Sequence, residues 1–182
     1  MALVSTPADE LGTVCPDFQL PATNGKTYSR KDFSLGNPFV IMFICNHCPY
    51  VKAIEDRLID LGHDLKKMNV PIVAICSNDS NNYPDDSFEA LKARAELKKY
   101  PFVYLHDDSQ HVAKQFGAVC TPDFFVYNKK SKLAYRRRLD DSWKDATKVT
   151  QRELLGAVKE LLLSDEFPKG QTPSMGCSIK WK

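Results

Sequence analysis

The sequence lacks the segments that carry a chain into or across a membrane. Its longest apolar run, Phe39 to Cys45, is far shorter than the roughly 20 residues that a bilayer-spanning helix needs. Residues 1–10 contain neither a basic stretch nor an apolar core, so they do not have the pattern of a secretory signal. We therefore expect a cytoplasmic protein with no membrane partner.

The chain also has little net charge and too few cysteines for a disulfide-bonded scaffold. Its formal net charge is +2 over 182 residues, which favours neither an acidic nor a basic partner. Six cysteines in a chain of this length do not replace a hydrophobic core, and 43% hydrophobic residues are enough to build one. We expect one domain over residues 1–182, with an irregular arm at 1–12, a tail at 165–182 and no internal repeat.

A segment of strand length leads directly into a Cys-x-x-Cys motif. Residues 39–44 are apolar without alternation, which indicates a strand buried on both faces, and Cys45 and Cys48 follow at once. From Pro49 to Met68 apolar residues recur every three or four positions, which predicts a helix. Because the first N–H groups of a helix are unpaired and the dipole there is positive, a thiolate at this point would be stabilised.

The rest of the pattern predicts an α/β order of elements. A second apolar strand at 70–76 completes a right-handed strand–helix–strand unit, and the polar segment 77–86 that follows it is expected to line a site. Asn24-Gly25 predicts a β-hairpin near the start of the chain. The later expected elements are a helix at 87–100, a strand at 102–105, a helix at 109–116, hairpin strands at 123–127 and 132–136, and a helix at 150–163.

This order of elements, with Cys45, Cys48 and the later Thr121-Pro122, resembles the thioredoxin fold. The likeness can be narrowed by segments that together are similar to the peroxiredoxin-like, AhpC/TSA-related and TlpA/ResA-like members of the thioredoxin family. These segments are 15–20, 24–28, 45–51, 77–79, 83–87, 118–123, 140–142 and 176–181. The resemblance implies a thioredoxin-like α/β fold: a central mixed sheet flanked by helices, with an N-terminal β-hairpin extension.

The resemblance also implies a thiol–disulfide oxidoreductase. Cys45 would attack a disulfide and Cys48 would resolve the mixed disulfide, while His47 and the helix start would stabilise the thiolate. A cis Thr121-Pro122 loop would face the pair and bind the backbone of the substrate. The implied substrate is a protein or small-molecule disulfide, electrons would come from another thiol system, and no dissociable cofactor is implied.

The same residues leave alternatives open. In peroxiredoxins the peroxidatic cysteine begins a helix and is followed by a proline, as Cys48 is followed by Pro49. A threonine normally stands three residues before that cysteine, and here Cys45 takes its place. The alternative is therefore a thiol peroxidase with Cys48 or Cys45 as the peroxidatic thiol. Cys45, Cys48 and Cys120 could instead bind a soft metal, although zinc usually takes four ligands and no second Cys-x-x-Cys occurs. A third alternative is an interaction module whose thiols are vestigial.

Two thioredoxin features are missing around the motif. Ile44 replaces the tryptophan before the first cysteine, and Phe39 replaces a buried aspartate that helps to deprotonate the second thiol. No other acid is placed by the sequence to take that role. Cys120, two residues before Pro122, is either a third redox thiol or a small buried residue. Cys177 either folds over the site, where it could resolve an intermediate, or is a free terminal cysteine.

The remaining candidates are expected to be structural or solvated. Cys15 and Cys76 fit core packing. His63, His106 and His111 are single and scattered, so we expect them at the surface. The basic residues between 129 and 138 are expected to form a solvated hairpin rather than a nucleic-acid site.

Overall fold

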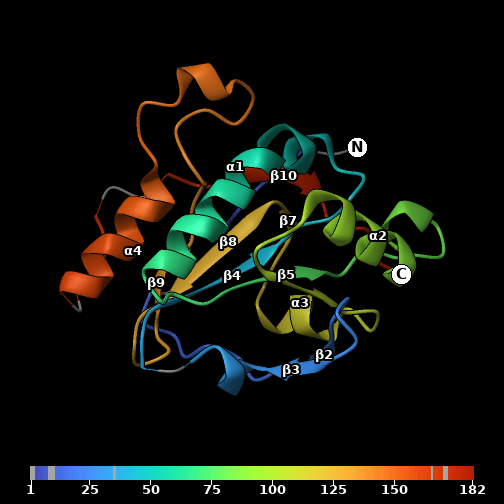
Figure 1. Cartoon of the computed structure of the whole chain (residues 1–182), viewed down its shortest axis with the longest axis horizontal. Coiled ribbons are helices and arrows are strands. Elements are labelled where there is room, and N and C mark those ends of the chain that lie inside the picture. Colours follow the sequence, from blue (N-terminus) through green and yellow to red (C-terminus); the bar gives the residue numbers. More distant parts are fainter. Residues whose placement is uncertain (1–2, 8–10, 35, 165, 170–171) are drawn as a thin grey trace.

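A five-stranded mixed sheet forms the centre of the computed structural model, which describes residues 3–7, 11–34, 36–164, 166–169 and 172–182. The strand order is β6-β5-β4-β8-β9, with β4 parallel to β5 and antiparallel to β8 (Figure 1). The strands are β4 (Phe39–Phe43), β5 (Ile72–Cys76), β6 (Val103–His106), β8 (Asp123–Tyr127) and β9 (Leu133–Tyr135). The predicted α/β class with a central mixed sheet is confirmed.

Both faces of this sheet are covered, which explains why β4 is apolar at every position. Val40 and Met42 belong to a core shared with α1, α2 and α4, whereas Ile41 and Phe43 belong to a core shared with α3 and the N-terminal hairpin. Figure 1 shows α1 and α4 on one side of the sheet and α3, β2 and β3 on the other. The helices are α1 (Pro49–Lys67), α2 (Phe88–Lys98), α3 (His111–Gln115) and α4 (Glu153–Leu163), with short turns η1 (Arg30–Asp32), η2 (Pro84–Asp86) and η3 (Ala146–Lys148).

The arm and the tail of the chain meet in a second, three-stranded sheet. β10 (Met175–Ser178) lies between β1 (Leu3–Ser5) and β7 (Cys120–Thr121), antiparallel to both. The prediction of an irregular arm is therefore wrong for Leu3–Ser5, and Cys120–Thr121, expected to lead into or form part of a loop, is a short strand. The predicted hairpin is confirmed as β2 (Gln19–Pro21) and β3 (Thr27–Ser29). Residues 1–2, 8–10, 165 and 170–171 of the predicted arm and tail lie outside the described residues.

Two side chains that were expected at the surface are buried. His106 ends β6 and lies beneath Phe88, with its ring 5.9 Å from that ring. Arg136 forms an ion pair with the buried carboxylate of Asp123 at 2.9 Å, and its guanidinium lies 4.4 Å from the centre of the Phe125 ring. The basic hairpin is thus not uniformly solvated, because a buried arginine needs a partner of this kind.

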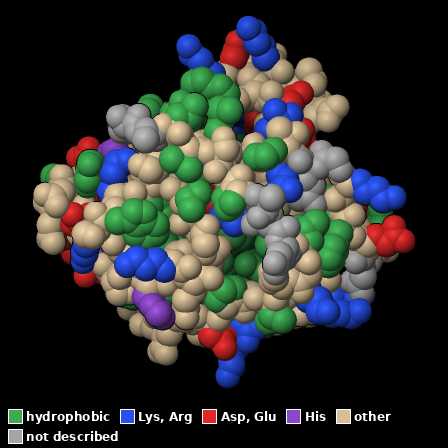
Figure 2. All heavy atoms as spheres, turned by 180° about the vertical axis from the view of Figure 1, so that it is seen from behind, with side chains coloured by type: hydrophobic (Ala, Val, Ile, Leu, Met, Phe, Trp, Pro, Cys, Tyr) green, Lys and Arg blue, Asp and Glu red, His purple; other side chains and the backbone are tan. Residues whose placement is uncertain are grey.

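The face of the molecule opposite to the view of Figure 1 carries both apolar and charged side chains. Figure 2 shows several separate groups of apolar side chains on the back of the molecule, with Lys and Arg spread between and around them. Among the described residues, no helix is both long enough and apolar enough to span a membrane.

Candidate active site

The Cys-x-x-Cys motif lies where β4 gives way to α1. Cys48 is the N-cap of α1 and Pro49 is its first residue, a position that tolerates proline because the N–H there has no partner within a helix. Cys45 is 2% exposed and Cys48 is 0% exposed. All six cysteines of the chain are free thiols. The two thiols of the motif therefore lie at the end of the helix that favours negative charge.

A buried carboxylate, Asp86 of η2, holds the loop between the two cysteines. Its Oδ1 accepts the backbone N–H of Asn46 at 2.7 Å and that of His47 at 3.3 Å. Its Oδ2 accepts the side-chain amide of Asn78 at 2.8 Å and lies 2.5 Å from Nδ1 of His47. A carboxylate removed from water needs such donors, so the loop and Asp86 stabilise each other.

The ring of His47 is held beside Cys45 by residues other than the thiols. It stacks on Tyr83 with ring centroids 5.0 Å apart, and its Nδ1 faces Asp86. A nitrogen of this ring, the Cys45 sulfur and a carboxylate oxygen of Asp86 all lie within 4.8 Å of one another. The ring nitrogen Nε2 is buried and has no hydrogen-bond partner among the residues that the structure describes. His47 thus neighbours Cys45, but Asp86 fixes its orientation.

Thr121 contacts both thiols from the opposite side. Its hydroxyl lies 3.3 Å from the sulfur of Cys45, and its carbonyl oxygen lies 3.2 Å from the sulfur of Cys48. The Thr121–Pro122 peptide bond is cis and faces the pair, as the resemblance implied. However, Thr121 is paired with Cys177 of β10, so the backbone expected to bind substrate is engaged by the chain itself.

The pKa values of the two thiols are shifted in opposite directions. The pKa of Cys48 is lowered chiefly by a hydrogen bond from the Cys45 thiol, and further by the Cys177 thiol and by a helix N–H, against the effect of burial. The pKa of Cys45 is raised by its role as the donor of that bond, by burial and by the charge of Asp86. One contact opposes this direction, since only a protonated Cys48 can donate to the Thr121 carbonyl. The resemblance assigns the thiolate to Cys45; the pKa shifts point to Cys48 instead, whereas the contact with the Thr121 carbonyl points to a protonated Cys48.

Three of the other cysteines, Cys15, Cys76 and Cys120, are buried core residues. Cys120 is buried, its thiol lies 3.7 Å from the carbonyl oxygen of Pro122, and burial raises its pKa. Burial likewise raises the pKa of Cys76 and takes that of Cys15 to about 12. Burial is the largest cause of the shift for each of these three thiols, which fits residues of the packed core.

Cys45, Cys48 and Cys120, the metal ligands that the sequence suggested, do not form one cluster of candidate ligands among the described residues. Within the described part of the chain, the only cluster of three candidate ligands is Cys45, His47 and Asp86, without Cys48 or Cys120. Three protein ligands and an open position would suit a catalytic zinc ion. Both oxygens of Asp86 already accept two hydrogen bonds each, so a metal would have to displace buried donors. We derive no metal chemistry from this cluster.

Asp86 is the residue that the sequence reasoning missed. It supplies the buried acid that was absent at Phe39, but it reaches the motif from the loop after β5 rather than from β4. The available signal was the polar segment 77–86 at the carboxyl end of a buried strand, where sites commonly form. What the segment could not indicate was which of its acids turns inward: Asp85 is exposed and Asp86 is buried.

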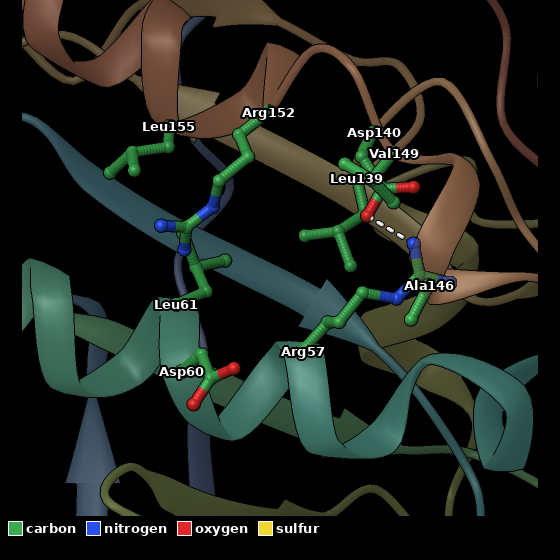
Figure 3. A pocket seen from close by; sticks show the side chains of 9 residues that line it. All are labelled: Arg57, Asp60, Leu61, Leu139, Asp140, Ala146, Val149, Arg152 and Leu155. Atoms are coloured by element: carbon green, nitrogen blue, oxygen red, sulfur yellow. Dashed lines mark hydrogen bonds and ion pairs between the residues drawn. The ribbon is translucent and has the colours of Figure 1, made fainter.

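Two cavities lie near α1; no residue of the motif lines either of them, but one reaches the cis proline. The cavity in Figure 3, of 310 Å³, lies between α1 and α4, and none of its nine lining residues is a cysteine. There Arg57 points to Asp140, which it binds at 2.5 Å. The other cavity, of 110 Å³, is lined by Tyr50, Pro122, Trp143 and Met175 among others. It reaches the cis proline and the start of β10, so it is the better candidate for contact with a substrate.

Comparisons with known proteins agree with this arrangement. The AhpC/TSA family matches residues 11–136. An uncharacterized conserved protein from Geobacillus kaustophilus is 42% identical, with a TM-score of 0.94 over 100% of this chain and 97% of that one. A hypothetical protein from Sinorhizobium meliloti is 36% identical, with a TM-score of 0.92 over 98% of both chains. A peroxidoxin from Mycobacterium tuberculosis is 19% identical, with a TM-score of 0.65 over 82% of this chain and 96% of that one.

The chain belongs to the AhpC/TSA family and has a thioredoxin-like fold, because the family match covers more than half of its length. This membership agrees with the peroxiredoxin-like, AhpC/TSA-related type of thioredoxin-fold protein that the sequence resembles. No curated protein matches it. Since the Geobacillus and Sinorhizobium proteins have no stated activity, the specific reaction is inferred from the site.

Replacing the organising carboxylate tests the site directly. Asp86→Asn removes the negative charge near Cys45, so the pKa of Cys45 falls and its alkylation extends to lower pH. The new amide also faces the donors of His47 and Asn78, which we expect to cost about 1–3 kcal/mol of unfolding free energy. Urea unfolding and peptide-resolved alkylation measure the two effects.

The matched control for this variant is Asp85→Asn, which removes an exposed carboxylate from the same short turn. It should leave both the stability and the alkylation profile of Cys45 close to the parent values. Equal behaviour of the two variants would contradict the role assigned to Asp86.

Proposed function

We propose that this protein is a thiol–disulfide oxidoreductase whose redox pair is Cys45 and Cys48. The observation that carries the proposal is the shared contact with Thr121, whose hydroxyl and carbonyl oxygens lie 3.3 Å and 3.2 Å from the two sulfurs. Two cysteines so placed at a helix start are suited to a reversible disulfide, since the motif closes a small ring. Membership of the AhpC/TSA family supports a redox role.

We assign the attacking thiolate of this reaction to Cys48, which reverses the order implied by thioredoxin. The Cys48 sulfur attacks one sulfur of a disulfide, forms a mixed disulfide and releases a thiolate. Cys45 then gives its proton to a departing thiolate and attacks the Cys48 sulfur, which releases the second half of the substrate. The protein gains a Cys45–Cys48 disulfide, and the substrate is reduced by two electrons to one thiol and one thiolate, which takes a proton from water. Another thiol system returns the electrons.

The surroundings of the pair support a small or locally unfolded disulfide substrate. The 110 Å³ cavity beside Pro122 offers the rings of Tyr50 and Trp143, whose centroids are 4.7 Å apart. The cavity also reaches Pro122, the residue after Thr121, whose oxygens contact both sulfurs. The cytoplasmic location and the identity of the electron donor stay predictions from the sequence.

Peroxide reduction is the second candidate, and one observation favours it. Cys48 is the N-cap of α1 directly before Pro49, which is the placement expected of a peroxidatic cysteine. In that reaction Cys48 would take an oxygen from the peroxide as a sulfenic acid, and Cys45 would release it as water by forming the disulfide. Steady-state rates with hydrogen peroxide and with a small disulfide decide which oxidant the pair reduces faster.

Single cysteine variants test the proposed order of attack. With 2-hydroxyethyl disulfide as substrate and dithiothreitol as donor, Cys48→Ser should lower turnover to that of the protein-free reaction. Cys45→Ser should still acquire a mixed disulfide on Cys48, because the attacking sulfur remains. Intact mass and peptide mapping identify the adduct. An adduct on Cys45 in Cys48→Ser, with none on Cys48 in Cys45→Ser, would restore the thioredoxin-like order.

The pH profile of alkylation tests the charge assignment. Because the pKa of Cys48 is lowered, its thiolate persists through neutral pH and disappears only as the pH falls through the lowered pKa. Iodoacetamide should therefore modify Cys48 at a nearly constant rate from alkaline to mildly acidic pH. Cys45, whose pKa is raised, should react appreciably only in alkaline solution. Mass spectrometry of the two peptides measures both profiles, and an inverted pattern would contradict the assignment.

A further inference from the structure

Strand β10 covers the edge of β7 beside the cis proline. Cys177 is paired with Thr121 and Ser178 with Cys120, in an antiparallel register. The opposite edge of β10 is paired with β1, so the strand is held from both sides. Figure 1 shows β10 close to the first turns of α1, where the Cys-x-x-Cys motif lies. The chain thus supplies its own strand at the position expected for substrate backbone.

The register of β10 brings a third thiol to the redox pair. Cys177 is 2% exposed and belongs to the same core cluster as Cys45 and Cys48. Its strand partner Thr121 is the residue whose oxygens lie within 3.3 Å of both of those sulfurs. The pKa of Cys177 is raised by burial and by its contact with the Cys48 sulfur. Cys48 therefore has a thiol neighbour on β10 as well as one in its own motif.

A glycine fixes the distance between β10 and Thr121. A Cβ atom at Gly176 would lie 2.0 Å from the carbonyl oxygen of Thr121 and 2.6 Å from its carbonyl carbon. A side chain at residue 176 would fit only if the backbones of β10 and Thr121 moved apart. The close approach of β10, and with it the position of Cys177, depends on the absence of a side chain at this residue.

We propose that Cys177 is a third redox thiol, which resolves the mixed disulfide on Cys48 by forming a Cys48–Cys177 bridge. The proposal rests on the proposed function, because it needs Cys48 to attack a disulfide first. Cys48 displaces one thiolate from a small disulfide and holds the other half. Cys177 gives its proton to a departing thiolate and attacks the Cys48 sulfur, which releases that half as a thiol. Two cysteine thiols are oxidised and one substrate disulfide is reduced.

This bridge would differ from the Cys45–Cys48 bridge in its structural consequence. It would tie β10 covalently to the start of α1, with β10 still on the edge of β7. The Cys45–Cys48 bridge leaves β10 attached by hydrogen bonds alone. Cys48 would then have two alternative disulfide partners, Cys45 and Cys177. A bridge to Cys177 would keep β10 paired with the Thr121 backbone.

The test uses the full chain and 2-hydroxyethyl disulfide. In Cys45→Ser, the adduct on Cys48 should disappear as a Cys48–Cys177 disulfide forms, at a rate independent of protein concentration. In the Cys45→Ser, Cys177→Ser double variant the adduct on Cys48 should persist. Intact mass and peptide mapping follow both species.

Two results would overturn the proposal in distinguishable ways. If the adduct forms and persists equally in both variants, or if the bridge runs to Cys120, Cys177 is not the resolving thiol while the proposed function stands. If no adduct forms on Cys48 in either variant, the proposed attack by Cys48 fails and the third thiol fails with it.

A second variant tests the placement of β10 without removing a thiol. Gly176→Ala, in the Cys45→Ser background, should slow bridge formation by roughly tenfold or more, because misplacing a reacting group by about 1 Å can cost on the order of 100-fold. Gly156→Ala in α4 is the control, since its added methyl group meets nothing within 4 Å. Equal rates in the two variants would contradict the positioning of Cys177 by β10.

Discussion

The site depends on one buried carboxylate. Asp86 binds the two backbone N–H groups between the cysteines and the ring of His47, so it fixes the loop that joins β4 to α1. Its charge also acts on the chemistry, because it opposes ionisation of the nearby Cys45. One group therefore shapes the motif and biases which thiol is charged. Thioredoxins place a buried acid in the strand before the motif, whereas this chain has Phe39 there and brings its acid from the loop after β5.

The features that could be predicted from the sequence are those that a contiguous segment encodes by its own pattern of residues. The apolar run of β4, the helical spacing of α1 and the Cys-x-x-Cys motif between them are contiguous, and each carries its own signal. The Thr121-Pro122 loop was placed by resemblance, and its cis bond and its contact with both thiols follow that expectation. These parts define the class of the fold and the position of the site.

The features that sequence could not predict depend on contacts between distant segments. β10 is four residues long and includes Gly176, so it has no periodic pattern, and its partners Leu3–Ser5 and Cys120–Thr121 lie far away in the chain. Asp86 is buried because hydrogen-bond donors of Asn46, His47 and Asn78 surround its carboxylate, and only the folded chain brings these donors together. The opposite pKa shifts of Cys45 and Cys48 arise from the relative positions of the thiols, which spacing alone does not fix.

The redox pair is best tested by a titration in defined thiol buffers, read by alkylation, intact mass and peptide mapping. We expect a reversible two-electron couple that joins Cys45 and Cys48. Since a stabilised thiolate favours the reduced form, its potential should be less negative than the roughly −270 mV of thioredoxin. Cys45 and Cys48 that remain reduced across the whole range of buffers would contradict the account.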